Sequence, residues 1–232
     1  MTHRGRLSSP TSGRTVPLAG ALILGALSAL LGAAPVVGSL SAQGPEAAAA
    51  ALGDLEWRHI GPVNMGGRVS AIHGLPGDPN TFWVGGADGG LWKTSNGGVT
   101  FEPQWQDEES YSVGAVAVAP SDPNVVWLGS GEGDPRNSVS YGLGVWRSTD
   151  GGSSWTYVGL RETERIHRIV VDPRDPDVAL VCAMGREWGP NPERGVFKTT
   201  DAGTTWTHVL AVDEDTGCSD MDIDLSNPRN VY

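Results

Sequence analysis

The sequence predicts an all-β protein built from repeated units of four short antiparallel strands. The first observation is an eight-residue pattern that occurs three times, at Thr94–Phe101, Ser148–Trp155 and Thr199–Trp206. Successive copies start 148 − 94 = 54 and 199 − 148 = 51 residues apart, and self-similarity at a fixed period is typical of repeat architectures. The second observation is a content of 33 glycines and 16 prolines in 232 residues, which favours short elements divided by turns.

Each repeat contains four candidate strands that are rich in valine, isoleucine, tryptophan and threonine. Runs that contain Asp-Pro or Asn-Pro stand at Leu75–Gly86, Ala119–Ser130, Val171–Ala183 and Asp224–Tyr232. Aromatic segments on either side of the eight-residue pattern supply the last two strands of each unit. Four antiparallel strands in about fifty residues form one blade of a β-propeller. The predicted blades are 57–106, 107–160, 161–212 and a truncated unit, 213–232.

These boundaries predict an incomplete propeller. They give about 3.5 blades, whereas a closed ring needs at least four. An open ring would leave apolar sheet surface in water. We therefore expect the chain to be an N-terminal fragment, and its partners to include the remaining propeller blades of the full-length protein.

The N-terminal segment has the order of a secretory signal peptide. Basic residues, the last of them Arg14, precede the apolar stretch Val16–Leu40, and small residues follow. We expect residues 1–42 to be a signal peptide and residues 43–56 to be a linker, which predicts a secreted or periplasmic protein. An uncleaved membrane anchor is the alternative, because the apolar stretch approaches spanning length. With cleavage after Ala42, the mature form has no membrane span.

The charge of the chain excludes two classes of partner. Its 16 basic and 27 acidic residues give a net charge of −11. The predicted signal peptide holds three of the basic residues and no acid, so the remainder has a charge of 13 − 27 = −14. Such a surface repels the phosphates of nucleic acids and of anionic membranes, and we expect neither as a partner.

The eight-residue pattern predicts a hairpin turn between the third and fourth strands of each blade. An Asx side chain (Asn96, Asp150 or Asp201) accepts hydrogen bonds from backbone N–H groups of its own turn. A glycine two residues later adopts a backbone conformation closed to other residues, and an aromatic side chain then begins the fourth strand as an apolar plug. The glycines are Gly98, Gly152 and Gly203, and the aromatic residues are Phe101, Trp155 and Trp206.

This pattern resembles the Asp box, S/T-x-D-x-G-x-x-W, of sialidases, sortilin-type receptors and related propellers. The second and third copies match the Asp box fully, and the first has Asn96 and Phe101 in place of Asp and Trp. In those families the Asp box is a structural hairpin far from the active centre. The resemblance covers about 57–232 and implies a propeller fold, with a structural rather than a catalytic role for Asp150 and Asp201.

The loops of one face are the predicted ligand-binding region. Because the four strands alternate in direction, the loops from the second to the third strand share a face with the loops between blades. These loops are long and varied, and binding residues concentrate on such loops. Carboxylates, arginines and aromatic rings together suit a sugar or a peptide, whereas a solvated acidic loop set is the alternative. The residues are Glu132, Asp134, Arg136, Tyr141, Arg186, Glu187, Trp188 and Arg194.

Asp88, in the shorter loop of the first predicted blade, is a candidate catalytic residue. The stretches "WRHIGPVNMGGRVSAI" and "DPNTFWVGGADGGLWK" resemble the opening blade of xyloglucanase-type glycoside hydrolases. In those enzymes an Asp in TD-x-GG-x-Y/W is one of two catalytic carboxylates, a role that the resemblance implies for Asp88. Ala87 replaces the threonine of that motif, and Trp92 comes one residue early. The partner acid that hydrolysis requires is expected beyond this chain.

Two further expectations concern residues near the end of the chain. Cys182 and Cys218 can form a disulfide in an exported protein, the alternative being two unpaired thiols. Asp220, Asp222 and Asp224 alternate along a predicted strand and could bind Ca²⁺, unless solvent or a basic residue relieves their repulsion instead. We expect no other cofactor and no other metal site, since the histidines lack metal-ligand spacing.

The sequence thus supports functions from different classes. The first is an exported ligand-binding platform for a glycan or a peptide, as in sortilin-like domains. The alternative is a glycoside hydrolase of xyloglucanase or sialidase type whose second catalytic acid lies beyond this chain. A third is an assembly factor for a larger exported complex. Propellers host all of these functions, so the fold alone does not discriminate between them.

Overall fold

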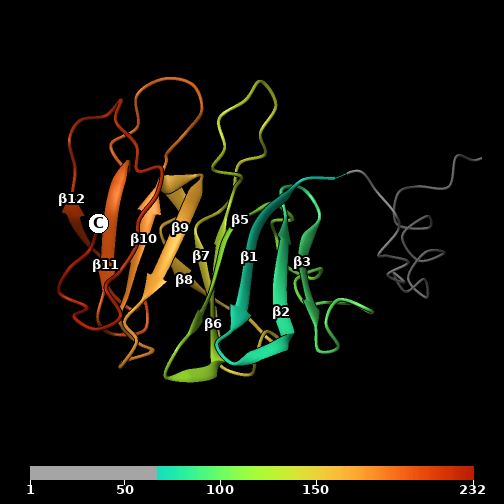
Figure 1. Cartoon of the computed structure of the whole chain (residues 1–232). Coiled ribbons are helices and arrows are strands. Elements are labelled where there is room, and N and C mark those ends of the chain that lie inside the picture. Colours follow the sequence, from blue (N-terminus) through green and yellow to red (C-terminus); the bar gives the residue numbers. More distant parts are fainter. Residues whose placement is uncertain (1–66) are drawn as a thin grey trace, which may run out of the picture. The chain divides into compact units, whose positions relative to one another are not determined.

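The computed structural model describes residues 67–232, which form β-strands, connecting loops and one short 3₁₀ turn, η1 (Arg161–Thr163) (Figure 1). The strands are β1 (Val69–Leu75), β2 (Asp78–Gly86), β3 (Gly90–Thr94), β4 (Glu102–Pro103), β5 (Val113–Ala119), β6 (Asp122–Ser130), β7 (Val145–Ser148), β8 (Thr156–Gly159), β9 (Ile166–Val171), β10 (Ala179–Ala183), β11 (Gly195–Thr199) and β12 (Thr207–Leu210). The predicted signal peptide, the linker and residues 57–66 lie outside the described residues. Within the described part, no helix has the length and apolar character to cross a membrane.

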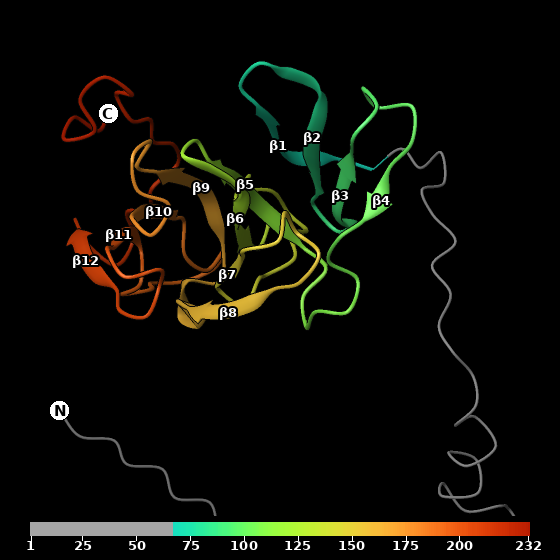
Figure 2. The same cartoon turned by 90° about the horizontal axis from the view of Figure 1, so that it is seen from below.

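The strands form three four-stranded antiparallel sheets, in the orders β1-β2-β3-β4, β5-β6-β7-β8 and β9-β10-β11-β12. Each sheet is an up-and-down meander of consecutive strands. Figure 2 shows the three sheets fanned out, with β1, β5 and β9 next to one another and β4, β8 and β12 at the outside. The predicted fold class is confirmed: the described residues are all-β and form part of a β-propeller.

A further strand pair begins after β12. The backbones of Asp222 and Tyr232 exchange two hydrogen bonds of 3.0 Å, and Ile223 forms an antiparallel bridge with Val231. Asp224 N donates to Asn230 O at 3.1 Å. This pairing encloses an Asn-Pro turn, whereas the turn between β1 and β2 is Pro76–Gly77 and the Asp-Pro pair begins β2.

Apolar side chains pack between neighbouring sheets. Trp83 and Leu91 of the first sheet lie in one buried cluster with Val113 and Val116 of the second. A second cluster joins residues of the second sheet, such as Trp127, to residues of the third. Removing these side chains from water favours the stacking of each blade on the next.

Two glycines allow the first strand of a blade to lie close against the preceding sheet. A Cβ at Gly85 in β2 would lie 3.1 Å from Val113 Cβ in β5, and one at Gly129 in β6 would lie 2.8 Å from Ile166 Cβ in β9. Both glycines stand six residues after the proline of the Asp-Pro pair that begins their strand, since 85 − 79 = 129 − 123 = 6. The equivalent residue of the third blade is Cys182, because 182 − 176 = 6.

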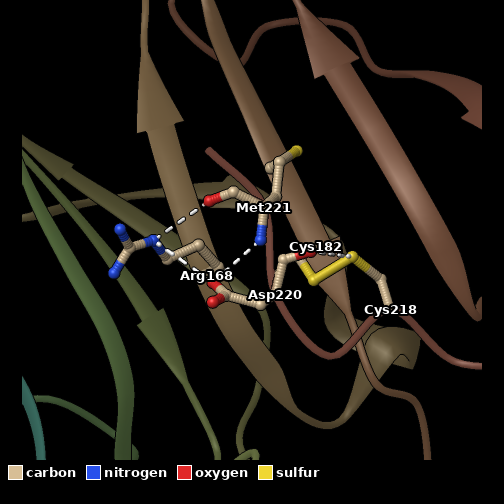
Figure 3. Close-up of a disulfide and its surroundings, with 5 residues drawn as sticks. All are labelled: Arg168, Cys182, Cys218, Asp220 and Met221. Carbon is tan, nitrogen blue, oxygen red and sulfur yellow. Dashed lines mark hydrogen bonds and ion pairs between the residues drawn. A yellow bond between two sulfur atoms is a disulfide. The ribbon is translucent and has the colours of Figure 1, made fainter. Parts of the chain in front are cut away.

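Cys182 forms a disulfide with Cys218, and the two Cα atoms are 5.1 Å apart (Figure 3). Cys218 stands ten residues before the proline of the next turn, as do Val113 and Ile166, since 228 − 218 = 123 − 113 = 176 − 166 = 10. The third junction between blades therefore has a covalent bond at the pair of positions where the first two junctions have a glycine and a β-branched residue. Beside it, Arg168 Nε donates to the carbonyl oxygen of Met221 at 3.2 Å.

The hairpin between β7 and β8 is held by two side chains. The Asp150 carboxylate accepts hydrogen bonds from Ser154 N at 2.8 Å and from Ser154 Oγ at 2.6 Å. Ser148 Oγ accepts one from Gly152 N at 2.8 Å. These bonds hold the pKa of Asp150 at about 2, below its ordinary value, because the Ser154 hydroxyl and amide stabilise the ionised form.

The other two hairpins repeat this arrangement. Asp201 accepts hydrogen bonds from Thr205 N at 2.9 Å and from Thr205 Oγ1 at 2.6 Å. In the first hairpin, Asn96 Oδ1 accepts one from Thr100 N at 2.9 Å. The glycines that follow have left-handed backbones, with φ of 86° at Gly98, 96° at Gly152 and 85° at Gly203. Phe101, directly before β4, meets Phe82 edge-on with ring centroids 6.0 Å apart.

The tryptophans of the second and third hairpins bind the preceding blade. Trp155 Nε1 donates to the carbonyl oxygen of Gln104, directly after β4, at 2.7 Å. Trp206 Nε1 donates to the carbonyl oxygen of Val158 in β8, also at 2.7 Å. The Trp206 ring meets Trp127 edge-on, with centroids 6.2 Å apart. Each half-buried indole thus fills the space between two blades and adds a directed hydrogen bond across the junction.

Candidate functional site

The long loops that follow β6 and β10 project from the same end of the described propeller blades (Figure 1). Gly142 N, in the loop after β6, donates to the carbonyl oxygen of Glu164, which precedes β9, at 2.5 Å. Leu160 and Glu164 flank η1 with φ of 60° and 55°. Non-glycine residues in this left-handed region are uncommon and cluster at functional sites. Met184 N, directly after β10, donates to the carbonyl oxygen of Arg165 at 3.0 Å, so the backbone brings three loops together at some conformational cost.

Arg194 shapes the loop after β10 from its interior. Its guanidinium is buried and donates hydrogen bonds to the carbonyl oxygens of Met184 at 2.7 Å, Arg186 at 2.8 Å and Gly189 at 3.2 Å. Arg194 was predicted to face a ligand, and that expectation was wrong. Its donors are turned toward its own loop, which places Arg194 as a support for the residues that the loop presents.

Two ion pairs join this loop to the residues before β9. The buried Arg165 guanidinium pairs with the Glu187 carboxylate, and Arg165 Nε donates to the carbonyl oxygen of Gly185 at 2.7 Å. Arg186 lies 3.4 Å from the Glu164 carboxylate. Burial lowers the pKa of Arg165, and the charge of Arg194 lowers it further.

A cavity of about 280 Å³ lies between the three loops. Its wall includes two strongly exposed aromatic side chains, Tyr141 at 68% and Trp188 at 74% exposure. Charged and polar side chains from both long loops complete it. We call this space the arginine–aromatic cavity, and it is lined by Arg136, Asn137, Ser138, Val139, Tyr141, Glu164, Arg165, Arg186, Glu187 and Trp188.

Five residues of the predicted ligand-binding face line this cavity: Arg136, Tyr141, Arg186, Glu187 and Trp188. Glu164 and Arg165, which precede β9, also line the cavity, although they were not among the predicted ligand-binding residues. Strand alternation predicts that this connection between blades lies on the same face, but a short charged segment resembles any solvated turn, so its individual residues do not stand out in the sequence.

Glu132 and Asp134 do not line the cavity. The Glu132 side chain is fully buried, and its carboxylate accepts hydrogen bonds from Arg68 Nε at 2.6 Å and Arg68 Nη2 at 2.5 Å. The prediction that Glu132 faces a ligand was therefore wrong, because Arg68 of the preceding blade occupies its carboxylate. Asp134 is exposed and lies 4.0 Å from His167 Nδ1.

Asp88 lines a separate cavity of about 310 Å³ in the first blade, together with Trp92, Trp105, Glu108 and Tyr111 among others. The Asp88 side chain is 46% exposed, and its carboxylate lies 3.9 Å from Arg68 Nη2. Glu108 Oε2 accepts a hydrogen bond from Trp146 Nε1 at 3.1 Å. Asp88 is thus an accessible carboxylate beside aromatic rings.

The predicted Ca²⁺ ligands do not converge. Asp220 and Asp222 each accept a hydrogen bond from the next backbone amide, at 2.8 Å in both cases. Asp224 accepts one from Ser226 N at 2.8 Å. Within residues 67–232, no group of three or more His, Cys, Asp and Glu side chains could hold a metal ion. The expectation of a site at these three aspartates was wrong because each carboxylate binds its own local turn.

No family model and no curated protein sequence matches the chain. Among solved structures it is similar to an ancestral GH74 enzyme, at 23% identity and a TM-score of 0.58 over 72% of this chain and 22% of that one. It is also similar to the GH74 enzyme of Niastella koreensis, at 22% identity and a TM-score of 0.51 over 67% and 23% of the two chains. A third structure, YCF48 from Cyanidioschyzon merolae, shares 20% identity, with a TM-score of 0.46 over 66% and 43%.

The chain spans less than a quarter of the length of either GH74 enzyme. At these identities the likeness concerns the fold alone, and it agrees with the three fanned sheets. The class of protein that the fold and the loops define is therefore a β-propeller with an aromatic and arginine-lined cavity on its loop-bearing end.

Proposed function

We propose that this propeller binds a glycan in the arginine–aromatic cavity. The proposal depends on one observation: Tyr141 and Trp188, from loops on different blades, expose their rings at the same cavity. Exposed apolar surface that is gathered in one place marks an interaction site. A sugar ring has an apolar face that packs on such rings and hydroxyl groups for polar side chains, which Asn137 and Ser138 supply here.

A screen of the full chain against an oligosaccharide array, followed by calorimetry on the ligands it retains, tests the proposal. We expect Trp188→Ala and Tyr141→Ala each to weaken binding by about tenfold or more, since truncating an aromatic anchor typically costs over 1.4 kcal/mol. Tyr232→Ala is the matched control, because Tyr232 is 79% exposed and does not line the cavity. Absence of binding to any glycan, or equal affinities of all three variants, would exclude the proposal.

A glycoside hydrolase is the second candidate function. The position of Asp88 supports it. Asp88 is accessible and lines a cavity with Trp92 and Tyr111, and a carboxylate that acts on a sugar must be accessible in this way. A catalytic role also needs a second carboxylate on the other side of the scissile bond. Glu132 is unsuited to that role, since Arg68 holds it in a buried pair.

Hydrolysis separates the two candidate functions. If the chain cleaves a β-glucan, Asp88→Asn should abolish the cleavage and leave binding at the arginine–aromatic cavity unchanged. Cleavage that survives in this variant would remove Asp88 from the chemistry.

A further inference from the structure

We infer that the arginine–aromatic cavity selects glycans that carry carboxylate groups, such as chains of uronic acids. This inference rests on the proposed function, since it names the class of glycan that the same cavity binds. It follows from the balance of charge in the wall of the cavity.

Most of the charged groups in the wall neutralise one another. Glu187 is paired with Arg165, and Glu164 lies 3.4 Å from Arg186. Arg136 lines the same cavity, yet it makes no hydrogen bond or ion pair with any residue of 67–232. The wall therefore has one positive charge in excess, on an exposed side chain that can move toward a ligand.

The surroundings add to this positive charge. Arg194 lies directly behind the loop. Its guanidinium is bound by three carbonyl oxygens and, among the described residues, by no carboxylate in hydrogen-bond contact. Arg194 lies close enough for its charge to lower the pKa of Arg165, after burial, which is the larger cause, while the carboxylates of Glu164 and Glu132 act in the opposite direction. The chain as a whole has a net charge of −11, so this is a local reversal of sign.

Over a short range the local charges dominate. Exposed charges that lie more than about 8–10 Å apart are largely screened at physiological salt, so a ligand in the cavity responds mainly to the arginines that line it. A guanidinium presents two parallel N–H donors that fit the two oxygens of a carboxylate. Arg186 is 45% exposed and held by a single glutamate at 3.4 Å, so it too can turn a donor toward a ligand.

The aromatic rings favour a sugar acid over an acidic peptide. Tyr141 and Trp188 offer flat surfaces to the apolar face of a pyranose ring, while the arginines bind the carboxylate attached to the same ring. An acidic peptide would engage the arginines and leave both rings exposed.

A matched pair of ligands tests the inference on the full chain. A β-1,4-linked tetraglucuronate and cellotetraose have the same rings and linkage and differ in the carboxylate at C6. By calorimetry at low salt we expect the tetraglucuronate to bind about tenfold or more tightly, and added salt to reduce that difference. Arg136→Gln and Arg186→Gln should each weaken binding of the acid by about tenfold and change binding of cellotetraose little.

Arg174→Gln is the control variant, because Arg174 is an exposed arginine whose ion pair is with Asp172, away from the cavity. Equal affinity for both oligosaccharides, or no effect of Arg136→Gln and Arg186→Gln, would overturn the charge selection and leave the proposed glycan binding intact. Binding of neither compound, with none on the wider array, would overturn both. Tighter binding of tetraglutamate than of tetraglucuronate, unaffected by Trp188→Ala, would overturn the assignment to a glycan.

Discussion

Asp150 and Asn96 occupy equivalent positions in two hairpins and show what the charge of an Asx side chain adds. Both accept a hydrogen bond from the backbone amide four residues later, at 2.8 Å and 2.9 Å. The geometry therefore needs only an oxygen acceptor. Ionisation adds strength to these bonds, which explains why the pKa of Asp150 falls to about 2.

This difference predicts a pH dependence of stability at a single residue. Because the folded pKa of Asp150 lies below its unfolded value, the ionised carboxylate stabilises the fold above about pH 4, and this contribution is lost as the pH falls toward 2. We expect Asp150→Asn to lower the melting temperature at pH 6 and to converge on the parent protein near pH 2. Thermal denaturation followed by circular dichroism at several pH values measures this. A difference that does not change with pH would contradict the explanation.

At the scale of the element, strands and hairpins could be predicted from the sequence. Whether a polar loop residue points toward a ligand or toward the protein interior could not. β1, β5 and β9 coincide with the β-branched runs that precede the Asp-Pro pairs, since strand propensity and turn chemistry are local properties. Glu132 and Arg194 were wrongly expected at the ligand because their partners are distant or are backbone carbonyls. Arg68 is 64 residues from Glu132, and no local pattern encodes that distance.

The loop after β10 is held from its interior by the side chain of Arg194. Arg194→Met keeps much of the apolar stem and removes three hydrogen bonds to carbonyl oxygens. We expect faster amide hydrogen exchange across residues 184–194 and a stability loss of about 1–3 kcal/mol, the cost of leaving buried acceptors without donors. Ligand affinity should fall with the loss of loop order.

Arg174→Met is the matched control for this loop. Arg174 is exposed, and its hydrogen bonds to the Asp172 side chain connect neighbouring residues of one turn. We expect its exchange pattern to match that of the parent protein. Unchanged protection of 184–194 in Arg194→Met would show that the other contacts of the loop suffice to hold it.

At the scale of the whole molecule, stability depends on the junctions between blades. Two junctions are closed by apolar packing, and each has an indole hydrogen bond across it. The third has the disulfide between Cys182 and Cys218. Its two cysteines are 36 residues apart in sequence, and closing a loop of that size restricts the unfolded chain by about 4 kcal/mol.

We therefore expect Cys182→Ala with Cys218→Ala to destabilise the chain by up to about 4 kcal/mol and to free the strand pair after β12 first. Urea unfolding monitored by tryptophan fluorescence gives the first quantity, and hydrogen exchange at residues 220–232 gives the second. Cys182→Gly with Cys218→Val is the informative comparison, because it recreates the residue types of the first junction. A double alanine variant as stable as the parent would show that the disulfide is dispensable.

Gly85, Gly129 and Cys182 occupy equivalent positions, so a disulfide like that of the third junction can also be placed at the first or the second junction. Gly85→Cys together with Val113→Cys should oxidise to a second cross-link, because Cβ atoms at these positions start 3.1 Å apart and a small parting of the sheets brings them to the spacing of about 3.8 Å that a disulfide prefers. In a propeller of this design, two substitutions are thus enough to replace close van der Waals packing by a covalent bond at a junction between blades.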